Sequence, residues 1–175
     1  MKPYALLAAI LLAIAPLAAA QHTGDPLTQE EINQLRDAAV EPEQRLKLYV
    51  QFCRARLVAL EQMRGDPKTT DRAQKTHAQL EEFLAIYDEL NDNIDNFVGR
   101  NDDLRKALKP VIEGDTEFQA KLRALRDSAN AAPEEAKQYE FVLSNSIETV
   151  DSSADDHRQL LAEQEEAYKH KKKSK

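Results

Sequence analysis

Apolar residues recur every three or four positions through most of the chain after residue 26, and this period predicts amphipathic helices. The spacing is most regular over residues 70–98, where it is typical of a heptad repeat. A second apolar row flanks the first, so we expect this helix to contact two neighbours. The first row is Ala73, His77, Leu80, Leu84, Tyr87, Asn91, Ile94 and Val98, and the second is Phe83, Leu90 and Phe97.

Short sequence motifs predict where the first two helices begin and end. Thr28 followed by Glu31 predicts a capping box that opens a short helix ending near residue 39. Pro42 suits the first turn of the next helix, because a missing amide hydrogen costs nothing there. The segment Gly65-Asp66-Pro67 ends that second helix and reverses the chain.

The second half of the chain is less regular. Past Gly99 the apolar pattern shifts and soon resumes, which predicts either a bend or a slightly disturbed continuous helix and no full reversal, with a kink at Pro110 and Gly114. Asp115 is placed to cap a further helical stretch. The last helix is expected to start at Pro133 and to reach the lysine-rich end.

These elements predict an all-α protein, an elongated antiparallel bundle of three to five helices with coiled-coil-like packing. Composition agrees, since there is no tryptophan and 31% of the residues are charged, whereas strands favour β-branched and aromatic residues. We expect one domain over residues 21–168. Its stability has to come from packing between helices, because isolated helices are marginal in water.

The first twenty residues predict a secretory signal peptide, with Lys2, an apolar run and small residues before the cleavage point. Cleavage between Ala20 and Gln21 would make the mature protein periplasmic or secreted. An uncleaved membrane anchor is the alternative, since such a helix needs roughly 17–25 apolar residues. Pro16 and the polar residues after position 20 favour cleavage of a bacterial-type signal.

Charge is unevenly distributed in a chain whose net charge is -7. An acidic body repels phosphates, so we expect no nucleic-acid partner. The basic residues at the C-terminus form a disordered or frayed tail over residues 169–175, which is a candidate for weak contact with an anionic envelope surface. They are Lys169, Lys171, Lys172, Lys173 and Lys175.

Cys53 is the one cysteine, so an internal disulfide is excluded. Its place on an apolar stripe predicts a buried thiol, and a cross-link between two chains is the alternative. His77 and His157 also fall on apolar stripes, as ligands in a metal-binding bundle would. Folding the last helix back near residue 131 would put His157 beside Arg105, far from His77, so we expect structural histidines and no metal site.

Several acidic residues gather on or just beyond the helix over residues 70–98, but their spacing is wrong for a calcium loop and predicts a solvated face. Asn91 is either a buried polar residue that fixes helix register or a solvent-facing one. No catalytic or cofactor motif is present, so we expect neither an enzyme nor a bound cofactor. The acidic residues are Asp88, Asp92, Asp95, Asp102 and Asp103.

The segment Leu27-Thr28-Gln29-Glu30-Glu31 resembles the Leu-Thr-x-x-Gln signature of the Spy family of periplasmic chaperones, with Glu31 where the family has glutamine. The likeness covers five residues and implies an exported, all-helical chaperone that needs no ATP. Our leading interpretation is an exported, non-enzymatic helical protein that acts by contact with a protein partner, with itself or with the envelope surface. The chaperone and a metal-binding bundle are the alternatives.

Overall fold

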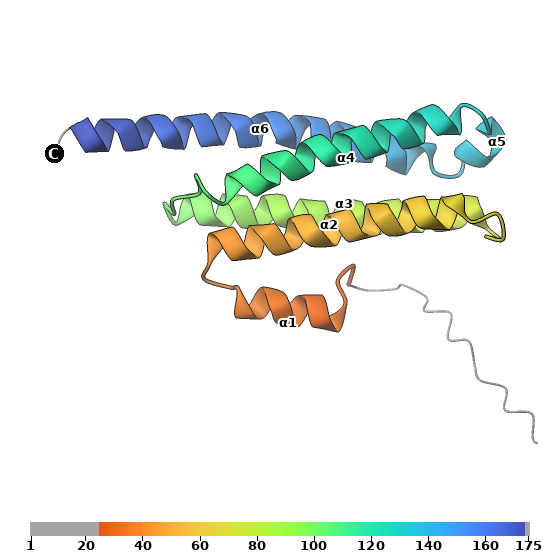
Figure 1. Cartoon of the computed structure of the whole chain (residues 1–175), viewed down its shortest axis with the longest axis horizontal. Helices are drawn as coiled ribbons and strands as arrows, with labels where there is room; N and C mark the ends of the chain where they lie inside the picture. Colours follow the sequence, from red (N-terminus) through yellow and green to blue (C-terminus); the bar gives the residue numbers. More distant parts are fainter. Residues whose placement is uncertain (1–24, 174–175) are drawn as a thin grey trace, which may run out of the picture.

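Four long helices run along one axis in the computed structural model, which describes residues 25–173 (Figure 1). The described residues contain helices and no strands, so the all-helical prediction is confirmed. Ala20, Gln21 and Lys175 lie outside the described residues. The long helices are α2 (Pro42–Gly65), α3 (Arg72–Gly99), α4 (Leu108–Ala129) and α6 (Glu140–Lys173), and the short ones are α1 (Gln29–Asp37) and α5 (Pro133–Ala136). Within this part of the chain, no helix combines the length and hydropathy needed to cross a bilayer.

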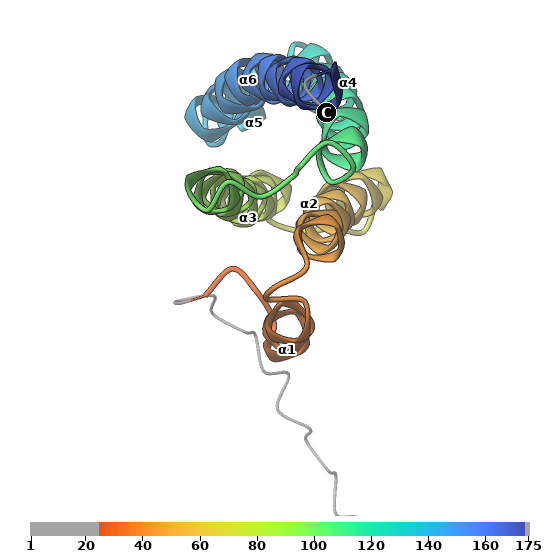
Figure 2. The ribbon, with the colours of Figure 1, turned by 90° about the vertical axis from the view of Figure 1, so that its left-hand side faces the viewer.

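The capping box predicted from the sequence starts α1. The Thr28 hydroxyl accepts from the Glu31 amide at 3.2 Å, and the Thr28 amide donates to Glu31 Oε2 at 2.7 Å. Glu31 also pairs with Arg56 of α2 at 2.7 Å, and Arg56 donates to the Pro26 carbonyl at 2.9 Å. The Arg56 guanidinium therefore holds the residues at the start of α1 against α2, and α1 lies on the outer side of α2 (Figure 2).

Helices α2 and α3 form an antiparallel hairpin. Pro42 occupies the first turn of α2 as the sequence predicts, and α2 ends at Gly65. Asp71 takes a left-handed backbone conformation, with φ 54°, immediately before α3 begins. The second predicted row of α3 is buried, and so are Ala73, Leu80, Tyr87 and Ile94 of the first row. His77, Leu84 and Asn91 of the first row are half-buried, and its last residue, Val98, is 38% exposed.

The chain reverses fully after Gly99, so both expectations, a bend and a slightly disturbed continuous helix, are wrong. Asn101 has a left-handed backbone with φ 61°, and residues 100–107 cross the end of the bundle before α4 begins (Figures 1 and 2). Leu104 and Ala107 are buried in this connection, which explains why apolar residues resume there. Pro110 lies in the first turn of α4, where it removes no helical hydrogen bond.

Helices α4 and α6 form a second antiparallel hairpin, joined by α5. The last helix begins at Glu140, later than the expected Pro133, because residues 133–139 form α5 and a turn. Glu135 of α5 pairs with Arg72 of α3 at 2.6 Å and with Arg64 of α2 at 2.8 Å. The hydrogen bond from Arg72, supported by Arg64, holds the pKa of Glu135 below its usual value.

The four long helices stand at the corners of a square when the bundle is seen end-on (Figure 2). Helix α2 contacts α3 and α4, and α6 contacts α4 and α3. The chain reverses at each connection between long helices, so α2 and α4 run in the same direction, and so do α3 and α6 (Figure 1). Because residues 100–107 cross diagonally, the helices of each such pair are neighbours (Figure 2). The rings of Phe83, Tyr87 and Phe118 meet in the core, with centroids 5.5–6.2 Å apart.

Replacing Gly114 with valine should destabilise the bundle. A Cβ atom at Gly114 would lie 2.8 Å from Val50 Cγ1 of α2, so Gly114→Val should lower the free energy of unfolding by about 1–3 kcal/mol through overpacking. Urea denaturation followed by helical circular dichroism measures the change. Gly99→Val is the matched control, because nothing lies within 4 Å of a Cβ there. Equal unfolding midpoints for the two variants would contradict this packing.

Candidate functional site

Three helices place a polar cluster in the core. Tyr87 of α3 donates its hydroxyl to Asp115 Oδ1 of α4 at 2.7 Å, and His157 Nδ1 of α6 lies 2.9 Å from Asp115 Oδ2. Tyr87 and Asp115 are fully buried, and His157 is 4% exposed. A buried carboxylate is costly unless it is hydrogen-bonded. Tyr87 and His157 are therefore the partners that allow Asp115 to lie among apolar residues.

The position of Asp115 corrects the expectation that it caps a helix. It lies inside α4, four residues after Val111 and three before Phe118, both of which are fully buried. Asp115 thus fills one place in the buried stripe of α4. This spacing is the signal in the sequence that Asp115 faces the core, but an aspartate after a glycine is also typical of a helix start, so the sequence alone does not distinguish the two positions.

Tyr87 and the nearby Cys53 both remain protonated. Burial raises the pKa of Tyr87 far above its ordinary value, and the Asp115 carboxylate raises it further. Burial likewise raises the pKa of the Cys53 thiol, with a smaller contribution from Asp115. Cys53 is completely enclosed, as its apolar stripe predicts. A protonated, enclosed thiol is a poor nucleophile, because the thiolate is the reactive form.

A groove between α3 and α6 opens beside this cluster, and we call it the α3/α6 groove. One part, of about 370 Å³, is lined by His157 and Ser153 of α6 and by Asn91 of α3. A second part, also of about 370 Å³, continues along α6 past the end of α3, where residues 101–103 and Arg105 of the connection to α4 line it. The two parts share three lining residues, Val98, Leu160 and Glu163.

Asn91 links α3 to α6 along the groove. Its Nδ2 atom donates to the Ser153 hydroxyl at 3.0 Å, whereas its enclosed Oδ1 atom has no hydrogen-bond partner within the described residues. Of the two roles left open by the sequence, the structure favours the first, because the half-buried side chain bonds across two helices. An enclosed acceptor without a partner costs about 1–3 kcal/mol, so a donor entering the groove would gain by reaching it.

The two histidines on apolar stripes have different surroundings. His157 contacts Asp115 and not the expected neighbourhood of Arg105, because α5 lengthens the turn between α4 and α6 and shifts their register. The His77 side chain is 40% exposed and lies 3.3 Å from Glu81. Within residues 25–173, no three His, Cys, Asp or Glu side chains are grouped to hold a metal ion.

The acidic residues that the sequence gathers near the end of α3 divide into two groups. Asp88, Asp92 and Asp95 lie on α3 and are exposed, and partial burial together with Asp92 raises the pKa of Asp88. The other two lie in the connection to α4 and pair with neighbouring arginines, at 2.5 Å in both the Arg100–Asp102 and the Arg105–Asp103 pair. Asp95 also lines the α3/α6 groove.

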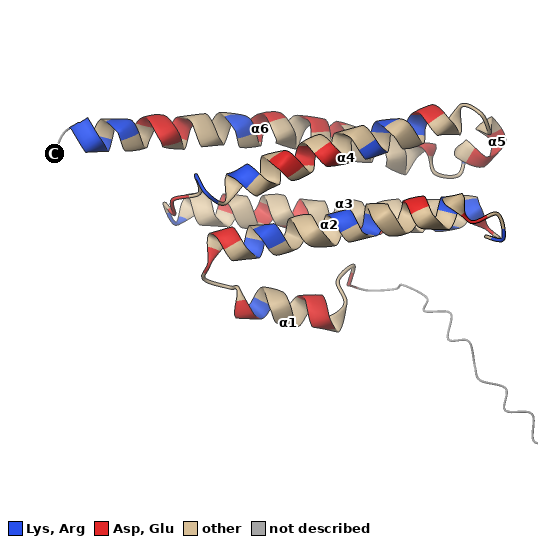
Figure 3. Cartoon of the chain, viewed as in Figure 1, with Lys and Arg blue, Asp and Glu red and all other residues tan. Residues whose placement is uncertain are grey.

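The basic residues expected in a frayed tail continue α6 as helix to Lys173. Gln164 binds α6 to the connection before α4, since its side chain accepts from the Leu104 amide at 2.7 Å and donates to the Asp102 carbonyl at 3.2 Å. Beyond it, the helix projects past the end of α3, and Figure 3 shows basic residues concentrated there. The basic residues in this end of the helix are Lys169, Lys171, Lys172 and Lys173.

Removing the Asp115 carboxylate should destabilise the protein strongly. Asp115→Ala leaves Tyr87 and His157 without their buried partner, so we expect a loss of about 2–6 kcal/mol in the free energy of unfolding, at about 1–3 kcal/mol for each stranded group. Urea denaturation tests this, with the exposed Asp127→Ala as the control. Adding Tyr87→Phe to Asp115→Ala should cost less than the two single changes together, because the stranded hydroxyl is gone. Additive effects would count against a shared cluster.

The five residues that resemble the Spy signature form the α1 capping box, in which Glu31 also binds Arg56. Comparison of the chain with protein-family models, curated proteins and solved structures finds no match.

Proposed function

We propose that the protein is exported and non-enzymatic, and that it works by contact, holding a polypeptide partner in the α3/α6 groove. The lining of the groove is the observation that supports this most directly. Val98 and Leu160 supply apolar surface, and Asp95 and Asp156 supply charge beside it. Apolar surface bordered by charged residues is the usual arrangement of a protein interface.

The bonding of the reactive side chains supports a role without catalysis. Both carboxylate oxygens of Asp115 are engaged within the fold, and Ser153 is engaged by Asn91. His157 borders the groove, but its Nδ1 atom contacts Asp115. These bonds join α3, α4 and α6, so the cluster is suited to holding the helices beside the groove in a fixed register.

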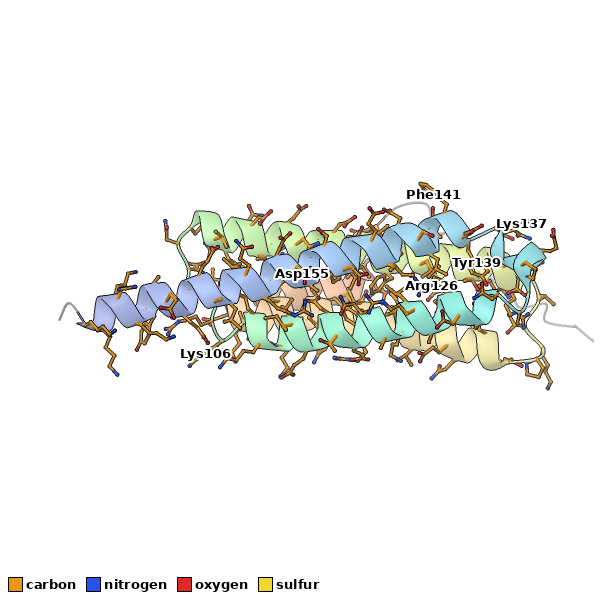
Figure 4. All side chains as sticks on the ribbon, turned by 90° about the horizontal axis from the view of Figure 1, so that it is seen from above. Lys106, Arg126, Lys137, Tyr139, Phe141 and Asp155 are labelled. Atoms are coloured by element: carbon orange, nitrogen blue, oxygen red, sulfur yellow. The ribbon has the colours of Figure 1, made fainter. Side chains whose placement is uncertain are left out.

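The chaperone alternative requires a broad exposed apolar patch, and the described residues offer less support for it. Val40 is 74% exposed and Phe141 is 86% exposed, and they belong to different parts of the chain. Figure 4 shows Phe141 projecting outward at the beginning of α6. Single exposed apolar side chains are common on soluble proteins. Val98 and Tyr168, which are also exposed, both line the α3/α6 groove.

Export predicts a defined mature N-terminus. The chain recovered from the envelope or the medium of a bacterial host should begin at Gln21, because the small residues through Ala20 fit a signal peptidase site. Intact-mass measurement of the fractionated protein tests this, and Ala18→Lys with Ala20→Lys should block processing. A folded, full-length chain confined to the cytosol would contradict export.

Contact through the groove predicts position-dependent cross-linking. A photoreactive amino acid at Gln159, which lines the groove, should give a covalent adduct with a polypeptide in cells that make the protein. The same probe at the exposed Glu113 of α4 is the matched control and should give none. Gel shift and mass spectrometry detect the adduct. Absence of any adduct at Gln159, or equal adducts at both positions, would contradict the proposed function.

A further inference from the structure

One stripe of α6 carries both charges of a self-complementary contact. Side chains on it recur at spacings of four and three residues, so they share one face of the helix, and all of them line the α3/α6 groove. The acidic end of the stripe lies beside α3, and the basic end lies on the part of α6 that projects past the bundle (Figure 3). The stripe consists of Asp156, Leu160, Glu163, Ala167 and Lys171.

We propose that the α3/α6 groove binds the basic end of α6 from a second copy of this chain, so that two copies pair about a two-fold axis. This pairing rests on the proposed contact function, and it identifies the partner as a second copy of the chain. With the axis passing between Glu163 and Gln164, the α6 helices run antiparallel. Asp156 of each copy then lies opposite Lys171 of the other, with Lys172 alongside. A two-fold contact uses the same surface on both copies, and it is the commonest symmetry of protein oligomers.

The acidic side of this contact is open. Asp95 and Asp156 are exposed on the groove, and Arg158, the basic residue nearest to Asp156 in sequence, pairs with Asp155 at 2.9 Å. The part of the groove beside His157 is lined by Asp95, Asp156 and Glu163 and by no lysine or arginine. Its charge therefore favours a basic segment over an acidic one.

Apolar surface at the same place gives the contact its hydrophobic part. Val98 is 38% exposed and Tyr168 is 49% exposed, and both line the groove. The Arg105 guanidinium lies 3.5 Å from the centroid of the Tyr168 ring and holds the ring in position. In the two-fold arrangement, Tyr168 of one copy lies opposite residues 159–160 of the other. It can then cover Leu160 and the neighbouring Val98.

The length of the projecting helix matches the surface that it has to cover. Residues 165–173 extend for roughly 13 Å at 1.5 Å per residue, and the distance from Asp156 to Gln164 along α6 is about 12 Å. The last turns of α6 extend past the end of α3 (Figure 1), so they are placed to reach a second molecule.

A charge-swap experiment tests this pairing. The chain beginning at Gln21 is measured by sedimentation velocity and light scattering at about 50 mM salt, where exposed charges are weakly screened. Two variants are made, Asp95→Lys with Asp156→Lys, and Lys171→Glu with Lys172→Glu. We expect a wild-type dimer and a twofold loss of mass in each variant, because each variant brings like charges together. An equimolar mixture of the two should restore the dimer, and so should one chain that carries all four changes.

Control measurements distinguish a variant that no longer forms the dimer from one that no longer folds. Glu43→Lys with Glu113→Lys changes the net charge on α2 and α4 by the same amount as Asp95→Lys with Asp156→Lys and should leave the dimer intact. Raising the salt to about 500 mM should weaken the wild-type dimer. The mixed dimer requires both variants to be folded, so its appearance cannot be explained by misfolding.

Three results would overturn the pairing. They are a wild-type monomer, variants that stay dimeric, and a mixture that stays monomeric. A monomer whose Gln159 probe links to a different polypeptide would overturn self-pairing while leaving the contact function standing. A monomer without any adduct would overturn both. A monomer that binds anionic vesicles, and whose vesicle binding is lost when residues 169–175 are deleted, would show that the basic end contacts a lipid surface. This result would also overturn the pairing.

Discussion

A carboxylate in an apolar core is the constraint on which the arrangement of these helices depends. Asp115 has no access to water, so two other helices must bring hydrogen-bonding groups to its level, and they do so through Tyr87 and His157. A shift of one helical turn between these helices would leave all three polar groups without their partners. The cluster thus selects one register for α3, α4 and α6 among several that apolar packing alone would allow.

Much of the fold follows from local sequence. The Thr28 capping box, the Pro42 start and the apolar spacing of α3 act over a few residues and are found where the sequence predicts them. The reversal after Gly99 does not follow from local sequence, because Leu104 is buried in a connection and continues an apolar spacing that is typical of a helix. A hydrophobic pattern records burial, and burial is not confined to regular structure.

The candidate site was predictable only in part. Tyr87 and His157 stand on apolar stripes, so their inward positions can be deduced, but their common partner cannot. That partner is decided by the register between α4 and α6, which depends on the length of the turn around α5. The diagonal connection at the other end of the bundle puts α3 beside α6. The α3/α6 groove is therefore a product of topology, and no single stretch of sequence encodes it.

The reactivity of the Cys53 thiol can report how often the helix bundle opens. Its sulfur is sealed inside the four long helices, so a thiol reagent can reach it only when helices separate. The rate of labelling therefore tracks how often the interior becomes accessible, without any added probe. Because the one cysteine forms no internal disulfide, this opening is governed by the packing of the helices and not by making or breaking a disulfide within the chain.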